Sequence, residues 1–306
     1  MIRVGSIYDM TLVKQTHIDS KSGLTPEQQL AAIFQAVGPL YKQRDKLLQQ
    51  LETRLRACNI CSLTLPELDV KERKQCERYF RDYVLPILSP QVVDPLHPFP
   101  HLPSKSLNIA VELKRGGQSC FGLVPIPKSL PPYLRLSERG LRYVLTEHLV
   151  LSYVEKLFDQ YQVVSRAVIS VTRNAAISPE DEDYDVNDDY RQHMRKVLKK
   201  RARLAPVRLE IQGEASEALV SSLCQRLELS REQVFRSKSP LALGYVYALE
   251  GQLPEESRAA LCYPPFQPCF PAGLNRGEKI LPQVLRRDVL LFYPFHSMDP
   301  FLKLVK

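Results

Sequence analysis

The residues from Tyr83 to Asn108 read YVLPILSPQVVDPLHPFPHLPSKSLN, and this stretch decides how the chain is organised. Its many prolines lie between a helix-like run and a strand-like run. Proline lacks a backbone N–H and fixes φ, so such a stretch suits neither a helix interior nor a central strand. We therefore expect an extended crossover here, with helices before it and a sheet after it.

The segment before the crossover has a helical pattern. From Thr25 to about Ala57, apolar residues recur at steps of three and four, which indicates a long amphipathic helix. The run Thr25-Pro26-Glu27-Gln28 matches a capped helix start. A second helix is expected from Pro66 to about Val84, after Cys58–Cys61 breaks the periodicity. The two helices predict a hairpin-like segment.

Strands and helices alternate after the crossover. Leu107–Leu113 and Cys120–Ile126 predict an antiparallel hairpin, because Gly116-Gly117 supplies positive φ for a tight turn. The pattern then predicts helices over Leu145–Phe158 (with Thr146 as its cap), Val186–Arg203, Ser216–Leu227 and Pro240–Glu250, and strands over Val163–Val171, Val207–Ile211 and Gln233–Arg236. Together these elements predict an α+β fold, with a helical hairpin-like segment followed by a mixed-sheet head domain with helices.

The C-terminal part begins with a proline-rich stretch, Tyr263–Gly273, which indicates a linker or an extended arm. A short helix over Leu281–Arg286, a buried strand over Asp288–Tyr293 and a helix from Ser297 to Lys306 are expected next. An apolar strand without neighbours should be a liability for stability.

Composition narrows the class of protein. The chain of 306 residues is 44% hydrophobic and 25% charged, as a soluble globular protein is. No apolar run approaches the roughly 20 residues that cross a bilayer, so we predict a cytoplasmic protein and leave peripheral contact with a membrane open. The net charge of +8 favours polyanionic partners, whether small or macromolecular.

Four stretches, in order along the chain, resemble the long-chain polyphosphate kinase family. They are Asp94–Pro100 with Ser106-Leu107-Asn108, Val171–Ala175, Pro206–Glu210, and Arg287–Leu291 followed by Tyr293-Pro294. The sequence departs from the family pattern at Leu285 and Arg286, where the family more often has Arg and Glu.

The resemblance implies three parts: a partial N-terminal helical domain over residues 1–64, the middle or head domain over 65–280, and a stub of the first catalytic domain over 281–306. The family carries its catalytic histidine, metal-binding groups and phosphate-binding arginines in a C-terminal half that would begin near the end of this sequence. Its tryptophan-containing N-terminal segment, which helps to hold adenine, has no counterpart, and the sequence contains no Trp. We therefore expect an internal piece of such an enzyme that is inactive alone, whether natural or truncated.

As a family member, the whole enzyme would reversibly transfer the terminal phosphate of ATP to polyphosphate through a phosphohistidine. Mg²⁺ and ATP would be bound by the missing domains, and neither is expected on this segment. The implied role here is structural: forming a homodimer or higher homo-oligomer and framing the tunnel for polyphosphate. The alternative is a non-catalytic polyanion-binding or assembly protein derived from the kinase. No aromatic-basic module predicts a specific nucleic-acid partner.

No catalytic or metal-binding residue is predicted. None of the six histidines has the His-x-Lys context of the family nucleophile, and Cys58-x-x-Cys61 lacks the second pair that zinc needs. The candidate anion contacts are Arg173, Arg208 and Arg287, because they lie within motif matches and carry a planar fork suited to phosphate oxygens. The alternative for each is a structural salt bridge.

Overall fold

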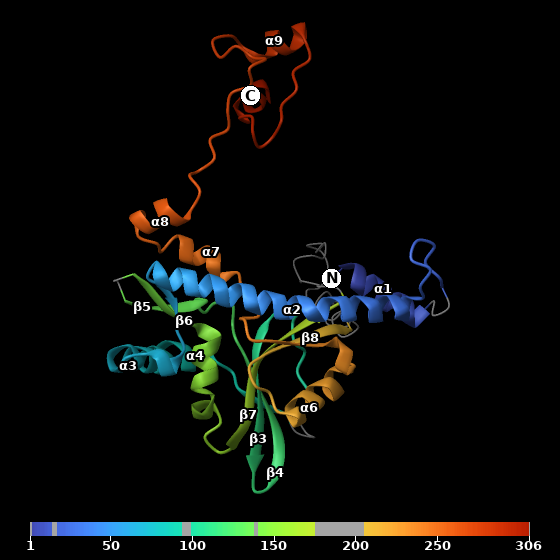
Figure 1. Cartoon of the computed structure of the whole chain (residues 1–306), viewed down its shortest axis with the longest axis vertical. Coiled ribbons are helices and arrows are strands. Elements are labelled where there is room, and N and C mark those ends of the chain that lie inside the picture. The colour runs from blue at the N-terminus through green and yellow to red at the C-terminus, as the bar shows by residue number, and fades with distance from the viewer. Residues whose placement is uncertain (1, 14–16, 94–98, 138–139, 175–204, 306) are drawn as a thin grey trace, which may run out of the picture. The chain divides into compact units, whose positions relative to one another are not determined.

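The computed structural model describes residues 2–13, 17–93, 99–137, 140–174 and 205–305 (Figure 1). The chain forms two compact units, Met1–Leu253 and Pro254–Lys306, and each is described by itself. The expected helix over Val186–Arg203 and most of the Asp94–Pro100 run lie outside the described residues.

The long predicted helix is confirmed as α2 (Pro26–Ala57). The hydroxyl of Thr25 accepts the backbone N–H of Gln28 at 3.3 Å, and the side chain of Gln28 accepts the N–H of Thr25 at 3.0 Å. A shorter helix, α1 (Ile2–Val13), precedes it. Residues of α1 and α2 share one small apolar cluster, so these two helices form the N-terminal pair.

The helix expected from Pro66 starts later than predicted. Leu65–Glu67 forms a separate 3-10 turn, η1, and α3 (Val70–Tyr79) begins after it. The reason is a second cap: the carboxylate of Asp69 accepts the N–H of Glu72 at 2.8 Å and restarts the helix. A π-helical turn, η2 (Phe80–Val84), and a 3-10 turn, η3 (Leu85–Ile87), lead into the crossover.

A mixed sheet forms the centre of the first unit, as the sequence predicts. Its strand order is β2-β4-β3-β7-β8-β9, and its bounds are β2 (Gln91–Val93), β3 (Leu107–Arg115), β4 (Gln118–Pro125), β7 (Gln162–Arg173), β8 (Pro206–Gln212) and β9 (Val234–Ser237). Neighbouring strands are antiparallel except β8 and β9, which are parallel. Gly116 and Gly117 have φ of 58° and 82°, which the tight turn between β3 and β4 requires.

Helices cover both faces of this sheet (Figure 1). On one face Ile109 and Val111 of β3 pack with Phe80 and with α4 (Thr146–Ser152). On the other face Ala110 belongs to the cluster that includes α6 (Glu217–Leu227). Because side chains of a strand alternate between faces, β3 supplies both cores.

A second, three-stranded sheet was not predicted. It has the order β1-β6-β5, with β1 (Ile60–Ser62), β5 (Tyr133–Ser137) and β6 (Leu141–Leu145). The helix predicted over Leu145–Phe158 is therefore shortened to α4, followed by the 3-10 turn η4 (Val154–Leu157). Thr146 is not its cap, because Leu145 holds that position and the Thr146 hydroxyl donates to the carbonyl of Pro131.

The last helix of the first unit is also shorter than predicted, since α7 covers only Tyr245–Glu250.

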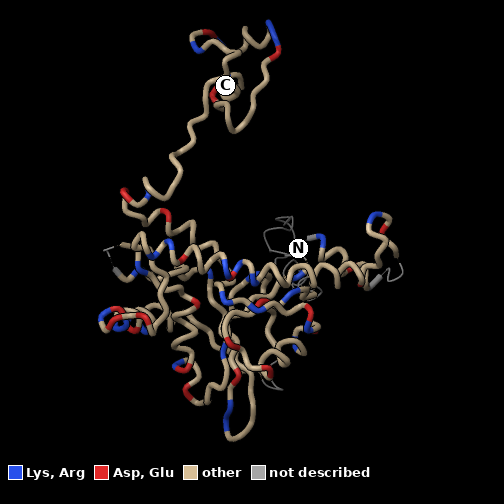
Figure 2. The backbone as a smooth tube through the Cα atoms, in the orientation of Figure 1, with Lys and Arg blue, Asp and Glu red and all other residues tan. Residues whose placement is uncertain are grey.

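Charged residues of both signs mix along α2 and α3, as Figure 2 shows. Lys114 and Arg115 at the end of β3 give the hairpin tip a basic character.

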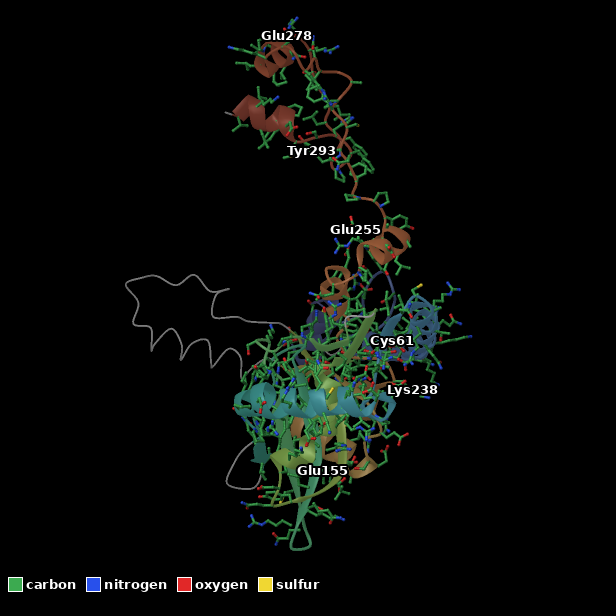
Figure 3. The ribbon with its side chains drawn as sticks, turned by 90° about the vertical axis from the view of Figure 1, so that its left-hand side faces the viewer. Cys61, Glu155, Lys238, Glu255, Glu278 and Tyr293 are labelled. Atoms are coloured by element: carbon green, nitrogen blue, oxygen red, sulfur yellow. The ribbon has the colours of Figure 1, made fainter. Side chains whose placement is uncertain are left out.

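The second unit holds α8 (Glu255–Leu261), α9 (Ile280–Arg286) and α10 (Asp299–Val305), with Glu255, Glu278 and Tyr293 labelled in Figure 3. The strand predicted over Asp288–Tyr293 is wrong. That segment pairs with no strand among the described residues, and Leu290 and Phe292 are 86% and 62% exposed. A strand needs a neighbour for its backbone groups, and the described part of this unit supplies none there.

Candidate functional site

Arg208 of β8 is the centre of a polar cluster between the large sheet and α2. Its guanidinium donates to the hydroxyl of Tyr41 at 2.8 Å and to the hydroxyl of Thr172 at 3.0 Å, and it forms an ion pair with the carboxylate of Glu210 at 2.9 Å. Thr172 lies directly opposite Arg208 on β7, so the strand register brings these two together. Every nitrogen of the Arg208 fork is thus engaged within the chain.

Glu210 is the buried partner in this cluster, at 6% exposure. Its carboxylate accepts the hydroxyl of Tyr41 at 2.6 Å as well as the Arg208 contact. Burial, together with this contact to Glu210, raises the pKa of Tyr41, so its hydroxyl keeps its proton. A buried carboxylate needs this kind of compensation, because its desolvation is otherwise costly.

Arg44 and Asp45 fasten α2 to the end of β9. The Arg44 guanidinium lies 4.6 Å from the Tyr41 ring centroid and donates to the hydroxyl of Ser237 at 2.6 Å. The Asp45 carboxylate accepts the N–H groups of Lys238 and Ser239 at 2.9 and 3.1 Å. Burial alone would raise the pKa of Asp45, but these hydrogen bonds hold it below its usual value.

A cavity of about 440 Å³ adjoins the cluster. Three cationic side chains line it, Arg44, Lys105 and Arg208, against the single carboxylate of Glu210. Arg44 and Arg208 are engaged as described above, whereas no ion pair of Lys105 occurs within the described part of the chain. The arrangement can therefore attract an anion weakly, and it offers no nucleophile paired with a base.

Of the three arginines singled out from the sequence, Arg173 and Arg208 have different partners within the first unit, and Arg287 belongs to the second unit. Arg173 donates to the carbonyl of Leu102 at 2.8 Å and turns toward the proline-rich crossover, whereas Arg208 turns toward α2. Burial lowers the pKa of Arg173. Arg287 lies in the second unit and donates to the carbonyl of Gly273. Arg208 does pair with a carboxylate, as the structural alternative predicts, and anion contact by any of the three stays a prediction.

Sequence reasoning missed Tyr41, Arg44 and Lys105. Tyr41 fits the apolar stripe of the long helix, and that pattern does not indicate that its hydroxyl contacts Glu210 and Arg208. The spacing of Tyr41 and Arg44, three residues apart on α2, was the available signal, because such residues share a helix face.

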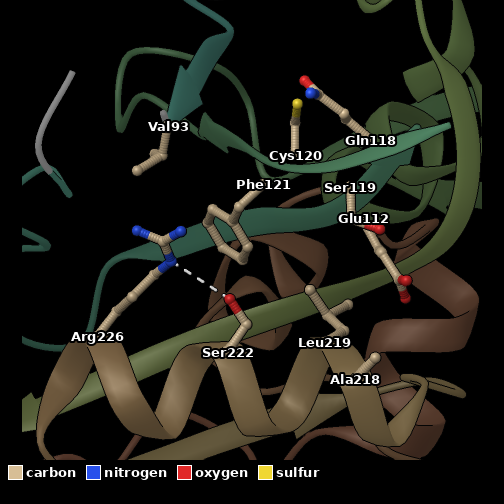
Figure 4. A pocket seen from close by; sticks show the side chains of 10 residues that line it. All are labelled: Val93, Glu112, Gln118, Ser119, Cys120, Phe121, Ala218, Leu219, Ser222 and Arg226. Carbon is tan, nitrogen blue, oxygen red and sulfur yellow. Dashed lines mark hydrogen bonds between the residues drawn. The ribbon is translucent and has the colours of Figure 1, made fainter. Parts of the chain in front are cut away.

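A second cavity, of about 730 Å³, lies between β4 and α6 (Figure 4). The Arg226 guanidinium lies 5.5 Å from the ring centroid of Phe121 and donates to the hydroxyl of Ser222 at 3.2 Å. Figure 4 shows that Phe121 points toward α6 and that Cys120 points away from it. Among the described residues the thiol of Cys120 makes no hydrogen bond, so the described lining of this cavity shows no pairing of the thiol with a base.

The described residues include no group of three or more His, Cys, Asp or Glu side chains that could hold a metal ion. Cys58 and Cys61 are free thiols. No helix within the described ranges is long and apolar enough to cross a membrane.

Comparisons with known proteins agree with one another. Residues 71–249, more than half of the chain, match a family model described as the polyphosphate kinase middle domain. The polyphosphate kinase of Exiguobacterium sibiricum is 32% identical over 311 residues, covering 100% of this chain and 43% of that protein. The polyphosphate kinase of Pseudomonas aeruginosa is 31% identical over 295 residues, covering 93% and 42%.

A solved structure gives the same result for the fold. The crystal structure of polyphosphate kinase from Porphyromonas gingivalis matches with a TM-score of 0.69 at 18% identity, over 99% of this chain and 45% of that one. The chain thus spans less than half the length of these relatives.

Proposed function

Because the chain belongs to the family of the polyphosphate kinase middle domain, we propose that it is the structural middle part of an enzyme that reversibly transfers the terminal phosphate of ATP to polyphosphate. The groups that carry a phosphohistidine step are assigned to polypeptide outside these 306 residues. In this proposal residues 1–64, 65–280 and 281–306 correspond to a partial N-terminal domain, the head domain and the first part of a catalytic domain.

The observation that carries the structural role is the engagement of Arg208 within the chain. Its guanidinium donates three hydrogen bonds, to the hydroxyls of Tyr41 and Thr172, and forms an ion pair with Glu210. These contacts hold α2 on the large sheet, which supports a structural role for Arg208.

Magnesium and ATP belong to the proposed whole enzyme. Mg²⁺ would neutralise charge on the transferring phosphate when bound. It prefers carboxylate oxygens, and the described residues gather no cluster of acidic ligands to hold it. The residues that the structure describes therefore do not form a site for Mg²⁺.

The alternative function, a non-catalytic polyanion-binding or assembly protein, is favoured by the cavity beside Arg208. Three cations face one carboxylate there, and the whole chain carries a net charge of +8. The affinity of such a basic surface for polyphosphate falls steeply as the salt concentration rises, because binding releases the counterions of the polyanion. Retention of the chain on immobilised polyphosphate in physiological salt supports this alternative, and elution at low salt opposes it.

A cytoplasmic location and a homodimer or higher homo-oligomer complete the proposal. The association with catalytic polypeptide is tested by co-purification with the C-terminal remainder of the Exiguobacterium sibiricum relative. A stable complex of the two supports a structural middle part. If they do not associate while each is folded, the proposal loses its basis.

A further inference from the structure

A segment near the end of the first unit, residues 238–250, lies over the start of α4. It follows β9 and ends with α7, which Figure 1 shows beside α2. The residues that directly follow β9 line a cavity together with His148 of α4. Leu241 packs against the apolar cluster that contains Leu149 of α4. All residues of this segment are described and none belongs to a strand, so we call it the strap.

Side-chain contacts fasten the strap at both ends. At its beginning, the Asp45 carboxylate of α2 accepts the N–H groups of Lys238 and Ser239 at 2.9 and 3.1 Å. At its end, the Tyr133 hydroxyl of β5 donates to the carbonyl of Ala248 at 3.1 Å. Because α7 has only six residues, such contacts with its neighbours, and not its own helical hydrogen bonds, keep it in place.

The strap adjoins a buried carboxyl group, that of Glu147. Glu147 is the second residue of α4 and is only 4% exposed. Apart from its own backbone N–H, its carboxyl has no hydrogen-bond or ion-pair partner among the described residues. Tyr245 of α7 lies close enough for a charge on Glu147 to act on its hydroxyl. A carboxylate without a cation is unfavourable in such a place, so the buried form is the neutral acid.

The other titratable groups beside α7 do not compensate a charge on Glu147. The hydroxyls of Tyr245 and Tyr143 are hydrogen-bonded to each other, and their rings lie 6.0 Å apart. Burial raises the pKa of both tyrosines, so both hydroxyls keep their protons. Glu52 of α2 acts on the same hydroxyls, and burial raises its pKa too. Arg56 is the cation beside Glu52, but it pairs with Glu67 at 2.8 Å.

The charged groups at the edges of the strap behave differently. Burial lowers the pKa of His148, so protonation of its ring disfavours burial at low pH, opposite in sign to a buried acid. Burial alone would raise the pKa of Asp45, but hydrogen bonds hold it below its usual value. Arg135 of β5 stays charged throughout. A rise from about pH 6 to about pH 8 therefore adds charge beneath the strap at the carboxyl groups of Glu147 and Glu52.

We propose that the strap is a pH-dependent latch, which opens from α4 when Glu147 becomes charged, because opening gives the carboxylate access to water. The large sheet keeps its own cores on both faces while the strap opens. The second unit follows the strap in the chain and begins at Pro254, so opening lengthens the unfastened connection to that unit.

The size of the effect follows from the two forms of Glu147. Burial raises its pKa to about 7 in the closed form, and exposure returns it toward 4.5 in the open form. The closed form therefore loses stability as pH rises, and the equilibrium constant for opening should grow about tenfold between about pH 6 and about pH 8. The open form stays the minor one, because opening removes Tyr245 and Leu249 from an apolar cluster.

Hydrogen exchange of backbone amides, measured by NMR on the whole chain, tests the latch. After correction for the intrinsic effect of pH on exchange, protection of the Ala248 and Leu249 amides in α7 should fall about tenfold from about pH 6 to about pH 8. Low concentrations of urea should accelerate exchange in β3 and leave α7 unchanged, since local opening exposes little surface. Equal protection and equal urea dependence in α7 and β3 would mean that the strap opens only on global unfolding, which overturns the proposal.

A pair of variants separates Glu147 from other carboxylates. Glu147→Gln keeps the size of the side chain and removes its titration, so protection of α7 should lose most of its dependence on pH. Glu232→Gln removes an exposed carboxylate and should behave as the wild type does. Equal pH dependence in Glu147→Gln and the wild type overturns the proposal.

A third variant tests the fastening and does not depend on a buried position. Tyr133→Phe removes the hydrogen bond to Ala248 and should lower the protection of α7 about fivefold at both pH values, with the pH dependence retained. Unchanged protection in this variant contradicts the fastening at β5. Tyr133 is partly exposed, so this variant and the wild type still decide the matter if Glu147→Gln does not fold.

Discussion

Glu210 shows how a single buried group ties two parts of the chain together. Tyr41 reaches it from α2 and Arg208 from the sheet, so the carboxylate joins elements that are distant in the sequence. The pairing of Arg208 with a carboxylate could be anticipated, because residues two apart in a strand share a face. The part of Tyr41 could not, since helix periodicity indicates only that a residue faces inward.

We predict that Arg208→Met destabilises the chain by about 3 to 5 kcal/mol, because it leaves the Glu210 carboxylate buried without its cation. The double variant Arg208→Met with Glu210→Met should lose less stability than this single change. Urea unfolding of the wild type, both single variants and the double variant gives the coupling between the two residues. If the losses in free energy of unfolding from the two single changes add up in the double variant, the interaction between Arg208 and Glu210 contributes nothing to stability.

Glu147 gives the stability a dependence on pH. Burial raises its pKa to about 7, above its ordinary value of 4.5. Between these pH values the folded chain binds more protons than the unfolded chain, so the free energy of unfolding falls as pH rises. The stability that Glu147 contributes is fully present below its ordinary pKa and is lost above its raised pKa. It amounts to roughly 3 kcal/mol at most.

Glu147→Gln should remove this contribution to the pH slope. Urea unfolding of variant and wild type at about pH 5 and about pH 8 measures the effect, which must be larger in the wild type. Identical slopes in the two proteins would mean that the buried carboxyl does not titrate in this range.

At the scale of elements, the sequence predicts the features that depend on neighbouring residues but not the strand pairs that form between distant parts of the chain. The capped start of α2 and the glycine turn between β3 and β4 depend on neighbouring residues, and both were predicted. Strand β6 pairs with β5 and also with β1, which lies far earlier in the chain, and no local pattern predicts these strands. The strand expected over Asp288–Tyr293 is wrong for the converse reason, because this strand-like segment has no neighbouring strand within the described part of the chain.

Gly122 tests how closely β4 packs against its surroundings. A Cβ at this position would lie 2.8 Å from Cδ1 of Leu113 and 2.9 Å from the Phe158 ring. Gly122→Ala should therefore destabilise the chain by about 1 to 3 kcal/mol, as overpacking of a core does. Thermal unfolding checks this, with Gly38→Ala as the matched control, because a Cβ there meets nothing within 4 Å. Equal effects of the two changes would contradict tight packing at β4.

At the scale of the whole molecule, ordered motifs identified the family, and the comparisons confirm it over residues 71–249. The same motifs could not locate a site, because Arg173 and Arg208 are engaged with different partners inside the first unit and Arg287 belongs to the second. The second unit exposes several large apolar side chains, among them Leu290, Phe292 and Phe301. A polypeptide that contributes catalytic groups would have such a surface to cover.

The central claim is that this chain is a structural part and does not transfer phosphate by itself. The most direct measurement uses labelled ATP with Mg²⁺ and follows both acid-precipitable polyphosphate and acid-labile phosphohistidine. It is made on the folded chain alone and on the chain mixed with the C-terminal remainder of the Exiguobacterium sibiricum relative. We predict no product from the chain alone and product from the mixture. Polyphosphate or phosphohistidine formed by the chain alone would contradict the claim.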